Sequence, residues 1–253
     1  MTNMTSVIGV IPARYASIRF PGKPLALLNG KPMIEWVVKN AAKSKTLSQV
    51  VVATDDDRIV KAVNAAGFRA VMTDSELPSG SDRIEAALLI LEKEAALGGG
   101  AIIVNIQGDE PLIQARMIDA LVAPLVADPE LEMSTLAHEI SDEDLQNMNA
   151  VKVVCNDFGD ALYFSRFPIP YSREKKPAGA CLKHVGLYAY QRHFLKKFCA
   201  TPPHVLERAE SLEQLRALAM GARIRVVRTE DRSWGVDTPG DLAKIEELLG
   251  AKP

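Results

Sequence analysis

Three cationic side chains gather in a short loop near the start of the chain. The segment at 11–23, IPARYASIRFPGK, places Arg14, Arg19 and Lys23 directly after the apolar run at 6–11. A short apolar run followed by such a loop is typical of a buried first strand that delivers the loop to the carboxyl edge of a sheet. Arg, Lys and backbone N–H groups form charge-assisted hydrogen bonds with phosphate oxygens. The loop therefore predicts a polyphosphate site, and a solvated basic loop is the alternative.

Carboxylates are expected at the same edge of the sheet. Asp109 and Glu110 follow the strongest apolar run of the chain, at 101–107. Asp237 ends a loop just before the last predicted helix. Magnesium prefers one or two carboxylates together with phosphate oxygens and water. Asp109 and Asp237 are therefore candidate Mg²⁺ ligands, with a turn residue and a helix-capping partner as their respective alternatives.

Other polar segments offer possible ligands. The turn at 78–83, PSGSDR, precedes a predicted helix. Its backbone could bind a base edge while Arg83 reaches a phosphate, and a plain helix start is the alternative. Glu213 and Gln214 are expected on a solvated helix face. His184 precedes a strand-like run, where it could contact substrate or lie on the surface.

Several common sites are excluded by spacing. A Walker A loop needs a glycine five residues before its Gly-Lys pair, whereas Ser17 stands there and Pro24 follows Lys23. The glycine run at 98–100 precedes a strand-like run, so it is interpreted as a connector and not as a dinucleotide-binding turn. The four histidines have no zinc-binding spacing, and no GxSxG elbow occurs. These patterns argue against a P-loop NTPase, an oxidoreductase, a zinc enzyme and a serine hydrolase.

The elements that must position these side chains follow a βαβ rhythm. Strands are expected at 6–11, 49–53, 70–72, 101–107 and 133–138, and helices at 33–43, 56–66, 81–97 and 115–128. Continuously apolar strands indicate a mainly parallel sheet covered by helices on both faces, which is a three-layer α/β/α architecture. Ser81 is predicted as a helix N-cap, and Pro111, Pro124 and Pro129 are expected near element ends.

The rhythm changes after about residue 150, which indicates a strand-rich insertion at 150–191. Its loop at 166–182, rich in proline and basic residues, is expected to be mobile or ordered by ligand. Strands outside the main sheet favour a dimer interface, with a second core within the monomer as the alternative. The insertion strands are expected at 150–154, 161–165 and 185–190, followed by helices at 192–200 and 205–220, a strand at 224–228 and a last helix at 239–249 capped by Thr238.

Composition sets the broad class. At 253 residues, 47% of them hydrophobic, the chain can bury a full core, so we expect a single domain over 1–253 that contains the insertion. The three cysteines form no CxxC pair, which favours a reducing compartment. The N-terminal sequence has neither a signal-peptide nor a membrane-span pattern, so the cytoplasm is the expected location. A net charge of −2 with interspersed charges offers no basic face for nucleic acid.

Motifs in a recognisable order cover nearly the whole chain. They are IPARYASIRFPGKPL at 11–25, NGKPMI at 29–34, VVATDD at 51–56, PSGSDR at 78–83, VNIQGDEPLI at 104–113, NAVKVV at 149–154, ALYFSR at 161–166, HVGLYAY at 184–190, SLEQLR at 211–216 and GVDTPGDL at 235–242. Together they resemble the 3-deoxy-manno-octulosonate (Kdo) cytidylyltransferases, also called CMP-Kdo synthetases. The resemblance implies a glycosyltransferase-A-like nucleotidyltransferase fold and a homodimer built partly from the later strands.

The resemblance also implies an activity: CTP and Kdo give CMP-Kdo and pyrophosphate, with Mg²⁺, for lipopolysaccharide biosynthesis. Arg14 and Lys23 match the triphosphate-binding loop, and Asp109 and Asp237 match the magnesium ligands. The remaining matches are Ser79, Gly80 and Arg83 near the cytosine and phosphates, and Gln107, Arg166, His184, Tyr188, Glu213 and Gln214 around the sugar acid, Gln107 also being counted with the nucleotide site.

The expected mechanism is in-line attack of the anomeric hydroxyl on the α-phosphorus of CTP, without a covalent enzyme intermediate. A related sugar acid, such as an 8-amino Kdo analogue or sialic acid, is an alternative acceptor. An alternative of a different class is a nucleotide-binding regulator that keeps the fold without turnover.

Overall fold

The computed structural model describes residues 6–16, 20–94, 100–173 and 179–250. Arg19, Ser17, the first two glycines of the 98–100 run and the centre of the 166–182 loop therefore lie outside the described residues. Contacts between Cα atoms group the chain into two compact units, residues 1–119 with 233–253, and residues 120–232. The insertion expected at 150–191 falls inside the second unit, whose boundaries are wider. A single domain over the whole chain stays a prediction.

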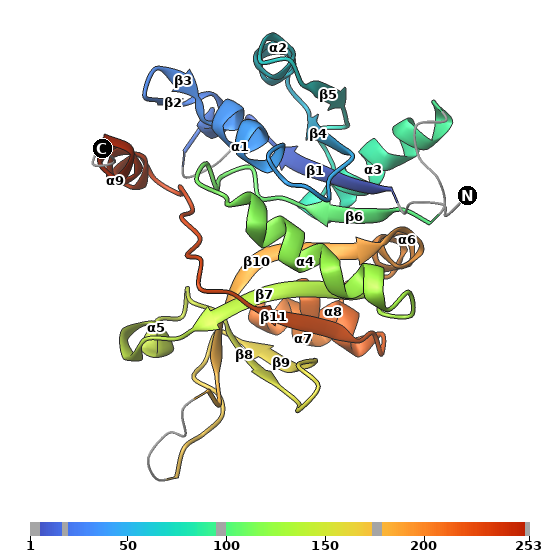
Figure 1. The fold of residues 1–253 in the computed structure, drawn as a ribbon, viewed down its shortest axis with the longest axis vertical. Coiled ribbons are helices and arrows are strands. Elements are labelled where there is room, and N and C mark those ends of the chain that lie inside the picture. The colour runs from blue at the N-terminus through green and yellow to red at the C-terminus, as the bar shows by residue number, and fades with distance from the viewer. Residues whose placement is uncertain (1–5, 17–19, 95–99, 174–178, 251–253) are drawn as a thin grey trace. The chain divides into compact units, whose positions relative to one another are not determined.

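The first unit is built on parallel strands in the order β6, β1, β4, β5 (Figure 1). Helices α1 (Met33–Ala41) and α2 (Asp57–Ala65) connect β1 to β4 and β4 to β5, and α3 (Gly80–Lys93) lies between β5 and β6 in the chain. Because such crossovers are right-handed and the last one returns across the sheet, α1 and α2 cover one face and α3 covers the other. The strands are β1 (Val7–Ala13), β4 (Gln49–Thr54), β5 (Arg69–Met72) and β6 (Ile102–Asn105).

The predicted elements of this unit are confirmed to within a few residues. Strands β1, β4 and β6 are almost continuously buried, as the unbroken apolar runs indicated. On α1 the buried residues are Met33, Ile34, Val37, Val38 and Ala41. That spacing places one apolar stripe of the helix against the sheet.

The C-terminal segment packs against N-terminal elements of the same unit. The hairpin of β2 (Leu27–Leu28) and β3 (Lys31–Pro32) turns at Asn29 and Gly30, which both have positive φ. An Asn-Gly pair is a strong signal for this turn, although this hairpin was not among the predicted elements. Helix α9 (Pro239–Gly250) lies near it (Figure 1). A buried cluster joins Leu28 of the hairpin, Met33 of α1, Val236 of the segment before α9, and Ile245 of α9.

The second unit contains a mixed set of strands. Strand β7 pairs in parallel with β11 and antiparallel with β10, and β8 pairs antiparallel with β10 and with β9. The β10–β7 register shifts between Val185 and Tyr188, which marks a bulge. The elements are β7 (Met133–Glu139), β8 (Lys152–Cys155), β9 (Ala161–Ser165), β10 (Leu182–Gln191), β11 (Ile224–Arg228), α5 (Asp142–Gln146), α6 (Arg192–Ala200), α7 (Val205–Glu210) and α8 (Gln214–Ala219), while α4 (Ala115–Ala127) crosses the unit boundary.

The N-cap predicted at Ser81 is wrong, because the cap of α3 is Ser79. The Ser79 hydroxyl accepts the backbone N–H of Asp82 at 3.1 Å and donates to its carboxylate at 2.7 Å. A serine followed three residues later by an acidic residue is the capping-box pattern. Ser81 instead lies inside the helix and is buried.

One further expectation about helices is wrong. The single helix predicted at 205–220 is two helices, since Ser211 adopts a left-handed conformation with φ 53° and ends α7. The apolar periodicity continues through Leu212 and Leu215, which hides the break from a pattern search. Pro124 lies inside α4 but in its last turn, three residues before the end at Ala127, which agrees with its expected place near an element end; that turn lacks one backbone N–H donor.

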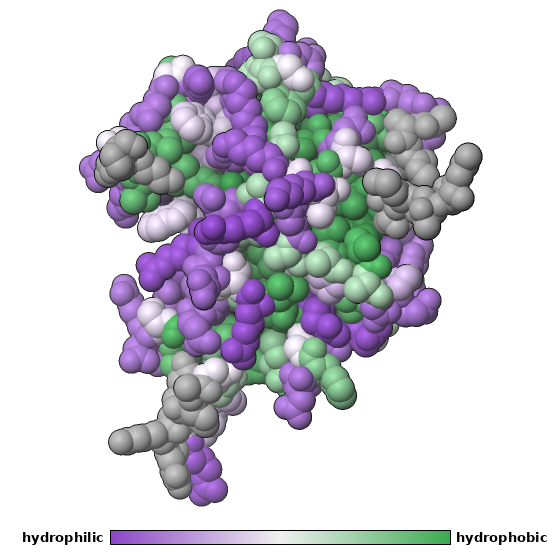
Figure 2. Space-filling model, in the orientation of Figure 1, coloured by the Kyte–Doolittle hydropathy of each residue, from purple (hydrophilic) through white to green (hydrophobic). Residues whose placement is uncertain are grey.

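The molecular surface drawn in Figure 2 is mostly hydrophilic, with smaller hydrophobic patches between the polar side chains. This agrees with the interspersed charges of the sequence. No helix among the described residues has the length and apolar character that a membrane crossing requires.

Candidate functional site

Three segments of the first unit meet at the Lys23 ammonium. Its Nζ donates to Asp109 Oδ2 at 2.8 Å and to the Val236 carbonyl at 2.8 Å. The nearest oxygen of the Asp237 carboxylate is 3.6 Å away. The loop after β1, the loop after β6 and the segment before α9 therefore bring the predicted cation and both predicted carboxylates together.

Gly22 sets the path of the basic loop. Its φ of +70° is left-handed, and its N–H donates to the Tyr15 carbonyl at 2.9 Å, which closes the loop at its base. A Cβ at this position would lie 3.2 Å from the Tyr15 ring. Glycine avoids both the backbone strain and the contact, so Lys23 can begin the short 3₁₀ helix η1 (Lys23–Leu25).

Asp237 does not cap α9, which was the alternative role expected for it. The carboxylate of Asp241 accepts the backbone N–H groups of Asp237 at 3.2 Å and Thr238 at 3.0 Å. In return, the Thr238 hydroxyl accepts the N–H of Asp241 at 3.3 Å, as expected for the predicted cap. Thr238 and Asp241 thus cap α9, while the Asp237 carboxylate lies beside Lys23.

A cavity of about 250 Å³ lies beside this cluster in the first unit. Gln107 belongs to its wall, and the Gln107 amide donates to the Asn105 side chain at 3.3 Å. Ser79 and Gly80 lie at the start of α3. Gly80 is close to Pro12, another residue of the wall, because a Cβ on Gly80 would lie 3.5 Å from the Pro12 ring. The wall consists of Pro12, Ala13, Arg14, Ala16, Lys23, Pro24, Gln107, Gly108 and Asp109.

Gly108 is a site residue that the sequence analysis missed. A Cβ at this position would lie 2.7 Å from the carbonyl oxygen of Pro12, closer than real Cβ atoms come. The missing side chain therefore lets the loop after β6 approach the end of β1. A lone glycine between a strand and an acidic residue is the signal that could have identified it.

We expect Gly108→Ala to lower both stability and activity. Because the contact is with backbone, the loop that carries Asp109 must move, and overpacking of this kind costs about 1–3 kcal/mol. The matched control is Gly235→Ala, whose added Cβ meets open space. Urea unfolding and single-turnover assays of both variants test the claim, and equal behaviour of the two variants would refute it.

Arg83 is buried and has protein partners. Its guanidinium donates to the Thr73 hydroxyl at 2.6 Å and to the Asp55 carboxylate at 3.0 Å. Asp55 in turn accepts the backbone N–H of Tyr15 at 3.3 Å. Burial lowers the pKa of the Arg83 guanidinium, and the charge of Asp55 opposes this. Arg83 therefore supports the basic loop through Asp55, while direct contact with a phosphate stays a prediction.

Glu110 was noted in the sequence without a role, and it is buried beside the site. Burial raises the pKa of its carboxyl to about 7; a hydrogen bond from Ser233 opposes the rise, and the charge of Asp109 adds to it. Its Oε2 has no hydrogen-bond partner among the described residues. The adjacent residues Asp109 and Glu110 are thus a partly accessible acid and a buried acid.

We expect Glu110→Gln to change how stability depends on pH. The pKa of the Glu110 carboxyl is higher in the folded protein than in the unfolded one. Its contribution to the free energy of unfolding is therefore fully present below about pH 4.5 and is lost as pH rises through about 7. In metal-free buffer, the free energy of unfolding of the variant should rise relative to that of wild type between pH 5 and 8, by at most on the order of 3 kcal/mol. Urea unfolding at several pH values measures this difference, and a gain that shrinks with pH would contradict it.

The predicted sugar residues fall mostly in the second unit. His184 lies within β10, not before it, and is buried; its Nε2 is 2.9 Å from the Thr135 hydroxyl. Burial lowers the pKa of His184 to about 3, so the imidazole is neutral at physiological pH. The Tyr188 ring lies 5.4 Å from His184, and burial together with the charge of Glu213 raises the pKa of Tyr188.

Gln214 is buried instead of lying on a solvated helix face. Its Nε2 is one of the few buried side-chain donors without a hydrogen-bond partner among the described residues. Glu213 precedes α8 as its N-cap residue and is half-buried. An unpaired buried amide costs free energy, which a ligand acceptor would recover.

Arg166 holds the backbone of two neighbouring segments. Its guanidinium donates to the carbonyls of Glu210 at 2.7 Å, Met148 at 3.2 Å and Ser211 at 3.3 Å. A guanidinium has five N–H donors, so these three contacts leave two. Arg166 can therefore organise its surroundings and still bind a carboxylate.

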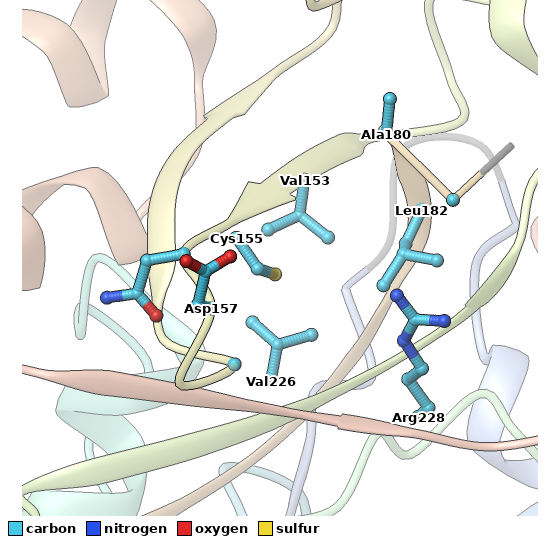
Figure 3. A pocket seen from close by; sticks show the side chains of 10 residues that line it. Val153, Cys155, Asp157, Ala180, Leu182, Val226 and Arg228 are labelled. Carbon is cyan, nitrogen blue, oxygen red and sulfur yellow. The ribbon is translucent and has the colours of Figure 1, made fainter. Parts of the chain in front are cut away.

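The second unit also has a cavity of about 400 Å³ that contains none of the predicted site residues (Figure 3). Val153, Cys155 and Val226 face one another across it, with Asp157 and Arg228 on opposite sides. Burial raises the pKa of the Cys155 thiol, and the charge of Arg228 opposes this. This cavity is separate from the residues assigned to substrates.

Comparisons of the sequence and the fold with known proteins identify the family of this chain. A family model described as "Cytidylyltransferase" matches residues 8–224. A relative from Bdellovibrio bacteriovorus, named 3-deoxy-manno-octulosonate cytidylyltransferase, is 56% identical over 97% of this chain and 98% of its own. The chain belongs to this cytidylyltransferase family. It is thus a nucleotidyltransferase, as predicted from its motifs.

Further members of the Kdo cytidylyltransferase family match over the same span. One from Geobacter sulfurreducens with the same name is 49% identical over 96% of this chain and 99% of its own. A solved structure of CMP:2-keto-3-deoxy-manno-octonic acid synthetase complexed with CTP has a TM-score of 0.89 and 43% identity, covering 97% of this chain and 99% of that one. The motif-based recognition of the family is confirmed.

More distant structures show the fold alone. 4-Diphosphocytidyl-2C-methyl-D-erythritol synthase matches with a TM-score of 0.65 and 13% identity, covering 97% of this chain and 98% of that one. The mainly parallel sheet with helices on both sides is a nucleotidyltransferase-like α/β fold, as predicted.

Proposed function

We propose that this cytidylyltransferase activates Kdo: CTP and 3-deoxy-D-manno-octulosonate give CMP-Kdo and pyrophosphate, a step for lipopolysaccharide biosynthesis. The observation that carries the proposal is the meeting of Lys23, Asp109 and Asp237 beside the cavity of the first unit. Family membership supports CTP as the nucleotide, because a relative of 43% identity was solved with CTP.

The chemistry assigned to the chain is neutralisation of charge. The anomeric hydroxyl attacks the α-phosphorus in line, and pyrophosphate leaves from the opposite side. Arg14 and Lys23 would stabilise negative charge on the phosphorus oxygens and on the departing pyrophosphate. Ser79, Gly80 and Gln107 would hold the nucleotide, with Arg83 acting through Asp55.

The residues present fit a divalent cation. The donor set is two carboxylates that already converge on one cationic group. The described residues contain no cluster of three or more metal-binding side chains, which agrees with a site that nucleotide phosphates complete. Asp109 and Asp237 would hold Mg²⁺, which when bound neutralises phosphate charge and orients the reacting groups.

The sugar acid is assigned to the predicted sugar-binding residues of the second unit. Arg166 would bind the carboxylate, and Gln214 would donate its unpaired N–H to a sugar oxygen. His184, Tyr188 and Glu213 would contact hydroxyl groups. A half-buried Glu213 beside Tyr188 favours a polyhydroxylated ligand over an apolar one.

We expect Arg166→Lys to raise the KM for Kdo by about tenfold or more. A lysine keeps the charge but loses the fork that binds a carboxylate with two hydrogen bonds. The KM for CTP should stay near the wild-type value. Initial rates with each substrate varied in turn measure both, and a parallel rise of the two constants would indicate a general loss of structure.

A pyrophosphate-release assay tests the function. The four nucleoside triphosphates are scanned against Kdo, its 8-amino analogue and sialic acid, with Mg²⁺ and with EDTA. The proposal predicts release with CTP, Kdo and Mg²⁺ together and loss of release with EDTA. Preference for another sugar acid would move the assignment to that substrate, and no release with any acceptor would favour a non-catalytic regulator.

The protein is proposed to act as a cytoplasmic homodimer. The strand-rich region at 150–191 exposes large apolar side chains, namely Phe158, Leu162, Phe167 and Tyr171, which are 60–88% exposed. Such side chains favour a subunit interface. The described cysteines are free thiols, which suits a reducing compartment. Sedimentation equilibrium distinguishes a dimer from a monomer.

A further inference from the structure

The Thr135 hydroxyl contacts three acceptor-capable groups at the bulge of β10. Thr135 Oγ1 lies 2.9 Å from the Leu187 carbonyl, 3.2 Å from the Val185 carbonyl and 2.9 Å from His184 Nε2. Thr135 is buried, so water is not available to replace any of these partners. The bulge brings both carbonyls to this one side chain.

Counting protons assigns the direction of each hydrogen bond. A hydroxyl has one proton, and a carbonyl oxygen can only accept. If the Thr135 proton pointed to His184, both carbonyls would face oxygen lone pairs at 2.9 and 3.2 Å. Donation to the nearer carbonyl, that of Leu187, leaves only the Val185 carbonyl facing a lone pair, and the hydroxyl oxygen then accepts a hydrogen bond from His184 Nε2–H.

The assignment fixes the state of the imidazole. A neutral histidine carries one N–H, so a proton on Nε2 leaves Nδ1 as an acceptor. Phe164 packs edge-on against the ring at 5.0 Å and Tyr188 lies at 5.4 Å, surroundings that disfavour an imidazolium. The described residues give Nδ1 no hydrogen-bond partner, and Nδ1 is not among the fully buried unpartnered atoms.

We propose that Thr135 is a positioning residue that fixes His184 as the Nε2–H tautomer, so that Nδ1 accepts a hydrogen bond from a hydroxyl of the sugar acid. The role toward the sugar rests on the proposed function. An acceptor nitrogen repels a carboxylate, so His184 selects a hydroxyl. The acid group is left to a cation such as Arg166.

Nitrogen NMR of ¹⁵N-histidine protein without substrate tests the tautomer directly. The His184 signals are assigned by their loss in His184→Gln, which separates them from the other three histidines. At pH 7 we expect a protonated Nε2 and an unprotonated Nδ1, with Thr135→Ser keeping this pattern and Thr135→Val losing it. A wild-type Nδ1–H tautomer or imidazolium would overturn the proposal, and the wild-type spectrum decides even if the valine variant does not fold.

Kinetics test the role toward the sugar. The KM for Kdo should rise about tenfold in Thr135→Val and stay near wild type in Thr135→Ser, with the KM for CTP unchanged in both. An unchanged KM for Kdo in a folded valine variant whose tautomer has changed would overturn this role. Absence of pyrophosphate release by the wild type would instead reject the proposed function while the NMR result stands.

Discussion

Asp237→Asn should reduce the rate of pyrophosphate release by about 10²–10³-fold with the fold intact. The amide keeps the size of the side chain but removes the charge that lies 3.6 Å from Lys23 and that would hold Mg²⁺. Capping of α9 is done by Thr238 and Asp241, so the substitution leaves the helix start unchanged. Initial rates at saturating CTP and Kdo measure the loss, and thermal unfolding checks the fold.

The matched control for this prediction is Glu246→Gln on the same C-terminal segment. Glu246 accepts the backbone N–H of Asn29 at 3.0 Å and so helps attach α9 to the β2–β3 hairpin. It also exchanges a carboxylate for an amide, but away from Lys23. The control should keep nearly full activity. An Asp237→Asn enzyme with near-normal turnover would remove Asp237 from the site.

Lys23→Met should lower kcat/KM for CTP by about 10²-fold or more. Two carboxylates would lose the cation between them, and the triphosphate would lose a partner for its negative charge. Lys23→Arg should recover little, because a planar guanidinium cannot place donors where one ammonium contacts both Asp109 and the Val236 carbonyl. Steady-state kinetics with CTP as the varied substrate measure the effect.

Metal binding separates this account from a simple loss of structure. Without nucleotide, the Lys23 ammonium competes with a divalent cation for the same carboxylates. Lys23→Met should therefore bind Mn²⁺ more tightly than wild type when CTP is absent, although its catalysis is worse. Titration calorimetry measures both affinities. Equal or weaker binding by the variant would show that the two carboxylates do not form the metal site.

Much of the fold could be predicted because its signals are local. The continuous apolar runs of β1, β4 and β6 indicated a parallel sheet, and the spacing of Met33, Val37 and Ala41 indicated a helix with one buried stripe. Parallel strands place their carboxyl ends at one edge. For that reason Lys23 and Asp109, although 86 residues apart in the sequence, could be expected near each other.

What the sequence analysis missed depends on contacts between distant residues. The need for glycine at 108 arises from the Pro12 carbonyl, and the burial of Arg83 arises from its partners Asp55 and Thr73. Neither contact produces a periodic pattern in the sequence. The role of Thr135 likewise depends on a bulge in another strand. Such features follow from packing, whereas a sequence pattern reports only the chain's own neighbourhood.

A crystal of the protein grown with CTP and Mn²⁺, the latter standing in for Mg²⁺, tests the central claim most directly. The anomalous signal locates the metal independently of the protein coordinates. The account predicts a metal at about 2.1 Å from carboxylate oxygens of both Asp109 and Asp237 and from phosphate oxygens of CTP, with Lys23 turned toward the triphosphate. A metal bound by phosphates alone, or CTP lying away from these three side chains, would contradict it.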